Sequence, residues 1–286
     1  MIPAAFDYVR AGSLEDALQH VGKPGAKFLA GGQSLLPLMK LRLARPETLV
    51  DIGGIAELRG VRPLPDGRIA VGALTTYTEL MDSPASHYGL LRDAVPDIGD
   101  VQVRNRGTVG GAIAHCDPAS DLPACFLALD AELVIRSSRG ERSTFCDGFY
   151  QGPFMTGLEA DELVTEVRLP APVEGAGSAY ASLSQPASGY SMVGVAAVVV
   201  RGGPGGPIVF SRLAITGVGE VPYRARAVED ALTGSDGSGQ AVAAAAAHAT
   251  DGVQVNSDLH ADAAYRTAMA AVYTRRAIEA ALGRIA

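Results

Sequence analysis

The sequence contains two glycine-rich turns, AGGQSL at residues 30–35 and RNRGTVGG at residues 104–111. The first lies between a predicted strand at 27–32 and a predicted helix at 34–43. Glycines let a ligand approach the backbone, and a helix N-terminus presents free N–H groups that suit a phosphate. Ser34 adds a hydroxyl donor. An ordinary strand–helix turn is the alternative interpretation, because a glycine pair is a weak motif by itself.

The second turn places glycines and a hydroxyl directly after two arginines, Arg104 and Arg106. Such a nest of N–H groups can hold a second anionic or polar segment of a ligand. A nucleotide-binding P-loop is excluded, because the pattern GxxxxGK[ST] is absent and no lysine follows Lys40. The alternative interpretation is a glycine-rich turn without a ligand.

Next along the chain is a cluster of polar residues, HCDPASD at 115–121. A metal site or a thiolate nucleophile is disfavoured, because His115 and Cys116 are adjacent and no second His or Cys lies at ligand spacing. Asp121 is better suited to accept hydrogen bonds from sugar or ribityl hydroxyls, as acidic residues do in dinucleotide sites. It also suits the N-cap of the predicted helix that follows, and both roles are compatible.

The pattern of predicted elements divides the chain into three parts. Residues 1–54 are expected to form a small βαβ unit, with a helix at 14–21 that Ser13 caps. Residues 55–172 alternate short strands with helices, which indicates an α+β sheet. A Pro/Gly-rich linker follows at 170–178. Residues 173–286 are expected to hold three antiparallel strands and then helices, at 179–185, 190–200, 207–216, 240–249 and 265–282.

Composition narrows the range of functions. The 286 residues carry a net charge of −7, and 48% are hydrophobic, so a large core is expected and nucleic-acid binding is not. The three cysteines, Cys116, Cys125 and Cys146, cannot supply the four thiolates usual in an iron–sulfur cluster or a Cys₄ zinc site. The longest apolar run, 193–200, is too short to span a bilayer, and no signal peptide is evident. We therefore expect a cytoplasmic protein without an integral membrane segment, whose redox chemistry would need a bound cofactor or another chain.

Together, three segments resemble the FAD-binding medium subunit of molybdenum hydroxylases. They are AGGQSLLPLMKLRLARPETLVDI (30–52), VGALTTYTEL (71–80) and VRNRGTVGGAIAHCDPASDLPACFLALDAELVI (103–135). The type is that of carbon monoxide dehydrogenase, with relatives among xanthine, quinoline and nicotine dehydrogenases. The resemblance implies an α+β, two-subdomain FAD-binding fold of the vanillyl-alcohol oxidase-like (PCMH) type. It also implies a C-terminal domain of three antiparallel strands plus helices.

The resemblance also implies FAD contacts at particular positions of this sequence. The residues that it assigns to FAD are Leu29, Ala30, Gly31, Gly32, Gln33, Ser34, Leu35, Ile98, Gly107, Thr108, Gly110, Gly111, Asp121, Leu163 and Tyr190. The first loop and the 107–111 turn would hold the diphosphate, and Asp121 the hydroxylated chain. Ile98 and Leu163 would make apolar contacts. Tyr190 would shield the flavin ring, with a strand-core tyrosine as the alternative. No side chain is expected to act as a catalytic acid or base or to bind a metal.

The sequence departs from the family pattern at one position. Many relatives have a lysine shortly after the aromatic residue that opens the first C-terminal strand. Here Tyr180 is followed by Ala181 and Ser182, so Ser182 stands where the lysine is expected. A cation beside the flavin would stabilise its anionic reduced form, so its absence changes the expected electrostatics at that end of the site.

The implied function is electron transfer within a larger enzyme. The chain would relay electrons from the [2Fe–2S] clusters of a small partner subunit, through FAD, to a terminal acceptor such as a quinone, NAD or oxygen. A large partner subunit would carry the molybdenum cofactor, and the assembly would be a dimer of heterotrimers. Two alternatives are a free-standing FAD-dependent oxidase and a non-catalytic assembly protein. Relatives act on carbon monoxide, purines, aldehydes or N-heterocycles, and the large subunit would select the substrate.

Overall fold

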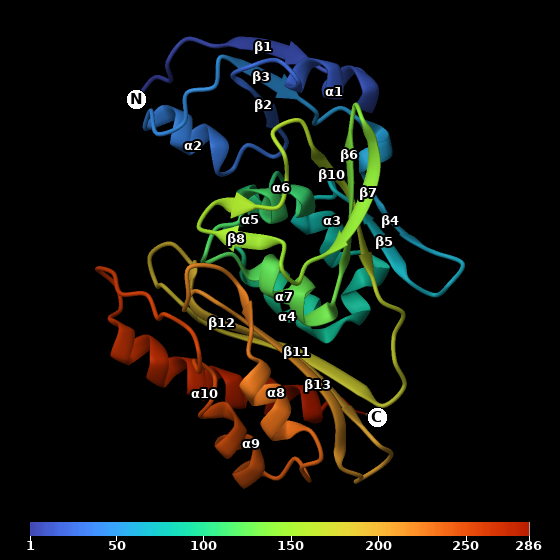
Figure 1. Cartoon of the computed structure of the whole chain (residues 1–286), viewed down its shortest axis with the longest axis vertical. Coiled ribbons are helices and arrows are strands. Elements are labelled where there is room, and N and C mark those ends of the chain that lie inside the picture. Colours follow the sequence, from blue (N-terminus) through green and yellow to red (C-terminus); the bar gives the residue numbers. More distant parts are fainter. Residues whose placement is uncertain (286) are drawn as a thin grey trace.

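The computed structural model describes residues 1–285, and its elements form three tiers along the long axis of the molecule (Figure 1). Each tier contains one main β-sheet. The N-terminal tier is blue in Figure 1, the middle tier runs from cyan to yellow-green, and the C-terminal tier from yellow to red. The predicted α+β class is confirmed.

The first tier is a three-stranded parallel sheet with the order β1-β3-β2. Its elements are β1 (Asp7–Arg10), α1 (Leu14–Val21), β2 (Ala26–Leu29), α2 (Leu35–Lys40) and β3 (Thr48–Asp51). As predicted, the Ser13 side chain caps α1 by accepting a hydrogen bond from the Asp16 N–H at 3.2 Å. Helix α1 buries Leu14, Leu18 and Val21 on one face, at the spacing of an amphipathic helix. Strand β1 is an addition that the sequence pattern did not predict.

The middle tier is a five-stranded antiparallel sheet with the order β4-β5-β10-β6-β7. Its strands are β4 (Val61–Pro63), β5 (Ile69–Gly72), β6 (Glu132–Ser137), β7 (Gly140–Phe145) and β10 (Leu163–Leu169). Its helices are η1 (Ala56–Leu58), α3 (Tyr77–Met81), η2 (Pro84–His87), α4 (Gly89–Asp97), α5 (Val101–Arg104), α6 (Val109–His115) and α7 (Asp121–Leu129). A short hairpin, β8 (Tyr150–Gly152) with β9 (Met155–Thr156), completes it. Helix α7 is buried along its whole length, which explains its lack of polar residues after Asp121.

One local prediction is wrong. The glycine-rich turn predicted at 104–111 is shorter, because Arg104 ends α5 and residues 109–111 begin α6, which leaves a turn at 105–108. The Thr108 side chain caps α6 by accepting a hydrogen bond from the Gly111 N–H at 3.2 Å. Glycine is required inside this helix for packing, because a Cβ at Gly110 would stand 2.5 Å from the Cβ of Ala73.

The C-terminal tier is an antiparallel sheet with the order β11-β12-β13-β14. Its elements are β11 (Ala176–Ser184), β12 (Ser191–Arg201), β13 (Ile208–Thr216), β14 (Tyr223–Arg224), α8 (Arg226–Leu232), α9 (Gly239–Ala246) and α10 (Ala263–Leu282). The three predicted strands are present, and the two-residue β14 is added at the edge. Val193, Val195 and Ala197 share a core with residues of α8, α9 and α10, and α10 packs directly on β12. Ala196 instead joins the core that contains α4 and α7. Because both faces of β12 are covered, its sequence is continuously apolar.

All three thiols lie in the interior. Cys116, Cys125 and Cys146 are free cysteines with no exposed surface. Burial raises the pKa of Cys116 to about 11 and that of Cys146 to about 12, and it raises the pKa of Cys125 well above its ordinary value. Residues 1–285 contain no group of three or more His, Cys, Asp or Glu side chains arranged to hold a metal ion. In the same residues, no helix has the length and apolar character needed to cross a membrane.

Candidate functional site

The two glycine-rich turns meet in the structure. A Cβ on Gly31 would overlap the carbonyl oxygen of Arg106, so the first turn closes directly on the backbone of the second. Gly32 has a φ of +74°, a left-handed conformation that favours glycine. The sequence predicted two separate ligand-binding segments, and the fold joins them into one site.

The first turn offers a run of free backbone donors. The N–H groups of residues 30–35 donate no hydrogen bond to another group within residues 1–285. The Ser34 side chain forms no cap bond, and both Ser34 and Gln33 are exposed. Leu29 and Leu35 are partly buried, and Ala30 packs against the core of the first tier. Free N–H groups at a helix start suit an anionic ligand, as predicted from the sequence.

The second turn differs from the predicted nest of free N–H groups. The Val109 N–H donates to the Thr75 carbonyl at 3.0 Å, and the Gly110 N–H to the Ala73 carbonyl at 2.8 Å. The Gly107 and Gly111 N–H groups are also paired, with Val103 and Thr108. These bonds fix the turn against α3 and β5. Within the 107–111 turn only the Thr108 N–H donates no hydrogen bond in the described residues, so the nest of free N–H groups is smaller than predicted. The neighbouring Arg106 adds a guanidinium group beside it.

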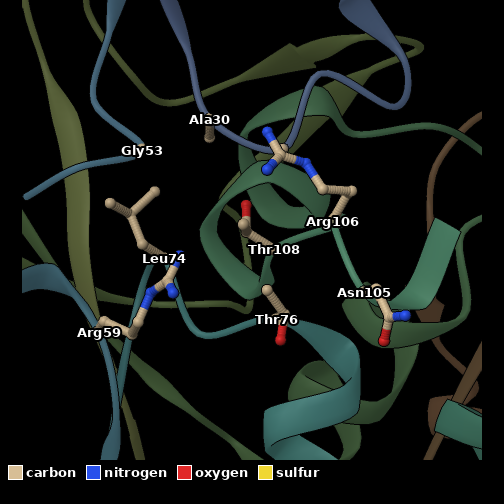
Figure 2. A pocket seen from close by; sticks show the side chains of 9 residues that line it. Ala30, Gly53, Arg59, Leu74, Thr76, Asn105, Arg106 and Thr108 are labelled. Carbon is tan, nitrogen blue, oxygen red and sulfur yellow. The ribbon is translucent and has the colours of Figure 1, made fainter. Parts of the chain in front are cut away.

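A pocket lies where the two turns meet (Figure 2). Its lining residues are Ala30, Gly31, Gly53, Arg59, Leu74, Thr76, Asn105, Arg106 and Thr108. Figure 2 shows the Arg106 side chain beside Ala30 and Thr108, and the Arg59 side chain beside Leu74. Arg59 forms one ion pair, with Glu79 at 3.6 Å, and Arg106 forms none within residues 1–285. Two guanidinium groups with little compensating charge make the pocket suited to an anion.

Several lining residues were not predicted as site residues. Thr76 belongs to the quoted stretch VGALTTYTEL, and its place at the start of α3 was the available signal. Leu74 belongs to the same stretch, whereas Gly53 and Arg59 come from segments without a recognisable motif. They reach the pocket because η1 turns the chain back beside β5, a long-range arrangement that local patterns do not reveal.

Asp121 is buried at the start of α7. Its Oδ1 accepts hydrogen bonds from the hydroxyls of Tyr180 and Ser191, the latter at 2.5 Å. Burial raises the pKa of Asp121, although both hydroxyl bonds act in the opposite direction. Asp121 is the first residue of α7, and Ser120 occupies the N-cap position, so the N-cap role considered for Asp121 is not observed.

The other predicted contacts lie outside the pocket lining. Ile98 ends α4 and packs on the middle core, and Leu163 opens β10 and packs against the core of the first tier. Tyr190 precedes β12 and is only partly buried, so it is not a strand-core residue. Its ring lies edge-on to His260, with centroids 5.8 Å apart. Ser182 lies on β11 opposite Gly194.

Comparison with known proteins identifies the family of the chain. Residues 4–172 match the family described as "FAD binding domain in molybdopterin dehydrogenase". Residues 178–281 match the "CO dehydrogenase flavoprotein C-terminal domain". The carbon monoxide dehydrogenase medium chain of Hydrogenophaga pseudoflava is 40% identical, with 100% of both chains covered. The glyceraldehyde dehydrogenase medium chain of Sulfolobus acidocaldarius is 36% identical, with 98% of this chain and 99% of the relative covered.

Solved structures show the same similarity in three dimensions. Carbon monoxide dehydrogenase from Hydrogenophaga pseudoflava superposes with a TM-score of 0.95 at 42% identity, with 100% of both chains covered. Quinoline 2-oxidoreductase from Pseudomonas putida 86 gives a TM-score of 0.92 at 33% identity, again with 100% of both chains covered. The chain therefore belongs to the carbon monoxide dehydrogenase-type family of FAD-binding medium subunits of molybdenum hydroxylases.

Proposed function

We propose that this chain binds the diphosphate of FAD in the pocket between the 30–35 turn and Arg106, and relays electrons through that FAD. The observation that carries the proposal is the row of unpaired N–H groups at residues 30–35, because its first two residues line the same pocket as two guanidinium groups. A diphosphate carries negative charge and many acceptor oxygens, so it satisfies both sets of donors at once.

The residues present fit such a group. Gly31 lies in the pocket lining, and the lack of a side chain there lets the first turn approach the Arg106 carbonyl closely. Thr76 and Thr108 also line the pocket. The Thr76 hydroxyl donates to Glu79 at 3.0 Å, whereas the Thr108 hydroxyl donates no hydrogen bond within residues 1–285 and can donate to a ligand. This donor set combines two guanidinium groups with one free hydroxyl, and residues 1–285 contain no cluster suited to a metal ion. It matches a phosphate ester rather than a metal or an apolar ligand.

Each contact in this proposal has a defined task. Arg59 and Arg106 balance the diphosphate charge, and Asp121 accepts hydrogen bonds from the hydroxylated chain. Ile98 and Leu163 supply apolar contacts, and Tyr190 shields the ring. When bound, FAD supplies the one- and two-electron chemistry that side chains lack. The side chains bind, orient and insulate it, and none needs to act as an acid or base.

The electron donor and the assembly are part of the same proposal. With three buried thiols, this chain has too few cysteines for an iron–sulfur cluster. A small partner subunit with [2Fe–2S] clusters would deliver electrons, and a large partner would hold the molybdenum cofactor. We propose a dimer of such heterotrimers in the cytoplasm, since free, unpaired cysteines are usual in a reducing compartment. Boundaries near residues 54 and 172 would separate the parts that enclose the flavin from each other and from the C-terminal part.

Reconstitution of the purified chain tests the proposal. After incubation with FAD and removal of free flavin, we expect stoichiometric FAD, released by denaturation and measured by its absorbance. FMN serves as the matched probe, because it lacks the diphosphate and adenosine and is expected to bind at least about 10-fold more weakly. Failure to bind FAD would contradict the proposal. So would turnover of a small oxidisable substrate by the isolated chain, which is the behaviour of a free-standing oxidase.

A further inference from the structure

We propose that Tyr180 and Ser191 are positioning residues that hold the Asp121 carboxylate for the FAD hydroxyls, so that FAD affinity depends on the C-terminal sheet. The proposal rests on the function proposed above and adds two residues to it. Neither residue is in the pocket lining, and both act through Asp121.

The first step is the environment of the carboxylate. Asp121 is 7% exposed, and its two donors, Tyr180 and Ser191, are 7% and 1% exposed. A buried carboxylate needs hydrogen-bond donors to remain ionised, and both donors here converge on the single oxygen Oδ1. No residue within 1–285 donates a hydrogen bond to the second oxygen, Oδ2. The two hydroxyls therefore fix the carboxylate through one oxygen and leave the other to accept from a ligand.

The second step places this carboxylate next to the second turn. The charge of Asp121 contributes to the raised pKa of Tyr77, whose main cause is burial of the ring. The same ring leaves no room for a Cβ on Gly107. Tyr77 is 9% exposed, and its hydroxyl has no hydrogen-bond partner within residues 1–285. Helix α6, which begins at Val109 within the second turn, also packs against α7, whose first residue is Asp121.

The third step is that both donors belong to the C-terminal sheet. Tyr180 lies on β11 and Ser191 opens β12, and β12 and β13 pack against α7. Two further hydrogen bonds join the sheet to the turn before α7. The Gly217 N–H and the Thr216 hydroxyl donate to the Pro118 carbonyl at 2.7 and 2.8 Å. The turn that leads into α7 is therefore held by the sheet.

The sequence of β12 accommodates the hydrogen bond between Tyr180 and Asp121. A Cβ on Gly194 would overlap the Tyr180 hydroxyl, so a glycine within apolar β12 lets that side chain cross the strand. Glycine weakens a strand interior, and its presence marks a close approach. Here the close approach lets the Tyr180 hydroxyl reach Asp121.

The experiment compares Tyr180→Phe and Ser191→Ala with Tyr223→Phe in the full chain. Tyr223 is the matched control, because its hydroxyl bonds the Ala249 carbonyl at 2.9 Å in the same tier, away from Asp121. FAD dissociation constants are measured by quenching of flavin fluorescence, and the stability of the apo chain by thermal unfolding. We expect Tyr180→Phe and Ser191→Ala each to weaken FAD binding about 10-fold. Tyr223→Phe should change it less than about twofold while lowering stability.

Two outcomes distinguish failure of the positioning role from failure of the proposed FAD-binding function. If wild type binds FAD and both Tyr180→Phe and Ser191→Ala bind it equally well, the positioning role is wrong, and the network only joins the sheet to α7. If wild type binds no FAD, the proposed function itself fails. Ser191→Ala removes a single small hydroxyl, so it keeps the test decisive if Tyr180→Phe does not fold.

Discussion

Gly31 lies directly against the carbonyl oxygen of Arg106, so two turns that are far apart in the sequence form one continuous wall. This contact defines the shape of the pocket. It also makes Gly31 the most sensitive position of the first turn, because any larger residue must push the turns apart.

We predict that Gly31→Ala weakens FAD binding. The added Cβ forces a backbone shift of the kind that costs about 1–3 kcal/mol, which raises the FAD dissociation constant about 10-fold or more. Flavin fluorescence titration measures the FAD dissociation constant. Gly12→Ala is the matched control, since a Cβ at Gly12 meets nothing within 4 Å. Wild-type affinity in Gly31→Ala would show that the diphosphate does not depend on contact between the turns.

We predict that Arg106→Gln weakens FAD binding about 10- to 100-fold, because a charge-assisted hydrogen bond contributes roughly 1.5–3 kcal/mol. Raising the salt concentration should weaken FAD binding to wild type more than to Arg106→Gln, since salt screens the lost attraction. Arg92→Gln is the control, because Arg92 is exposed on α4 and forms no ion pair within residues 1–285. Equal effects of the two substitutions would rule out a specific role for Arg106.

We predict opposite effects of Asp121→Asn on stability and on FAD affinity. Burial raises the folded pKa of Asp121 above its ordinary value of 3.8. Protonation therefore favours folding: this contribution is complete below the ordinary value and is lost as pH rises through the raised folded value. At neutral pH the substitution removes the cost of burying a charge, so the apo chain should unfold at an equal or higher temperature.

The stability advantage of Asp121→Asn should shrink as pH falls, and thermal unfolding of the apo chain across pH measures it. FAD affinity should fall at neutral pH, because an amide oxygen is a weaker acceptor than a carboxylate. A variant that binds FAD as wild type does would exclude Asp121 as a ligand. A strongly destabilised apo variant at neutral pH would contradict a net cost of burying the Asp121 charge.

We predict that Glu162→Gln destabilises the middle tier in a pH-dependent way. The Arg142 guanidinium bonds both carboxylate oxygens, at 2.7 and 2.6 Å, and lowers the pKa of Glu162. The resulting stability is present above the ordinary value of 4.5 and is lost as pH falls through the lowered folded value. Because Arg142 is partly exposed, the expected loss is about 1 kcal/mol at neutral pH.

Urea denaturation at neutral and acid pH measures this loss, which should disappear in acid. Glu141→Gln is the control, because Glu141 is exposed and lies 3.8 Å from Arg136. It should change the free energy of unfolding by less than about 0.5 kcal/mol. A pH-independent loss in Glu162→Gln would show that packing, rather than the ion pair, is responsible.

Local physical signals in the sequence predict much of this fold. The Ser13 cap and apolar spacing locate α1, and the continuous apolar run locates β12 because both its faces are covered. Helix α6 was missed because glycine is a poor helix former, and here packing against Ala73 overrides propensity. The first glycine turn was also predictable, whereas Arg59 was not, since only the tertiary fold brings it there.

The burial of Cys116, Cys125 and Cys146 has a practical consequence. Thiol-directed reagents attack thiolates at accessible sulfur atoms, and all three native thiols are enclosed, with raised pKa values. A cysteine introduced at an exposed position would therefore react selectively with a maleimide dye or spin label, without removal of the native cysteines. The chain is therefore well suited to measurements of the distance between a labelled surface position and a bound flavin.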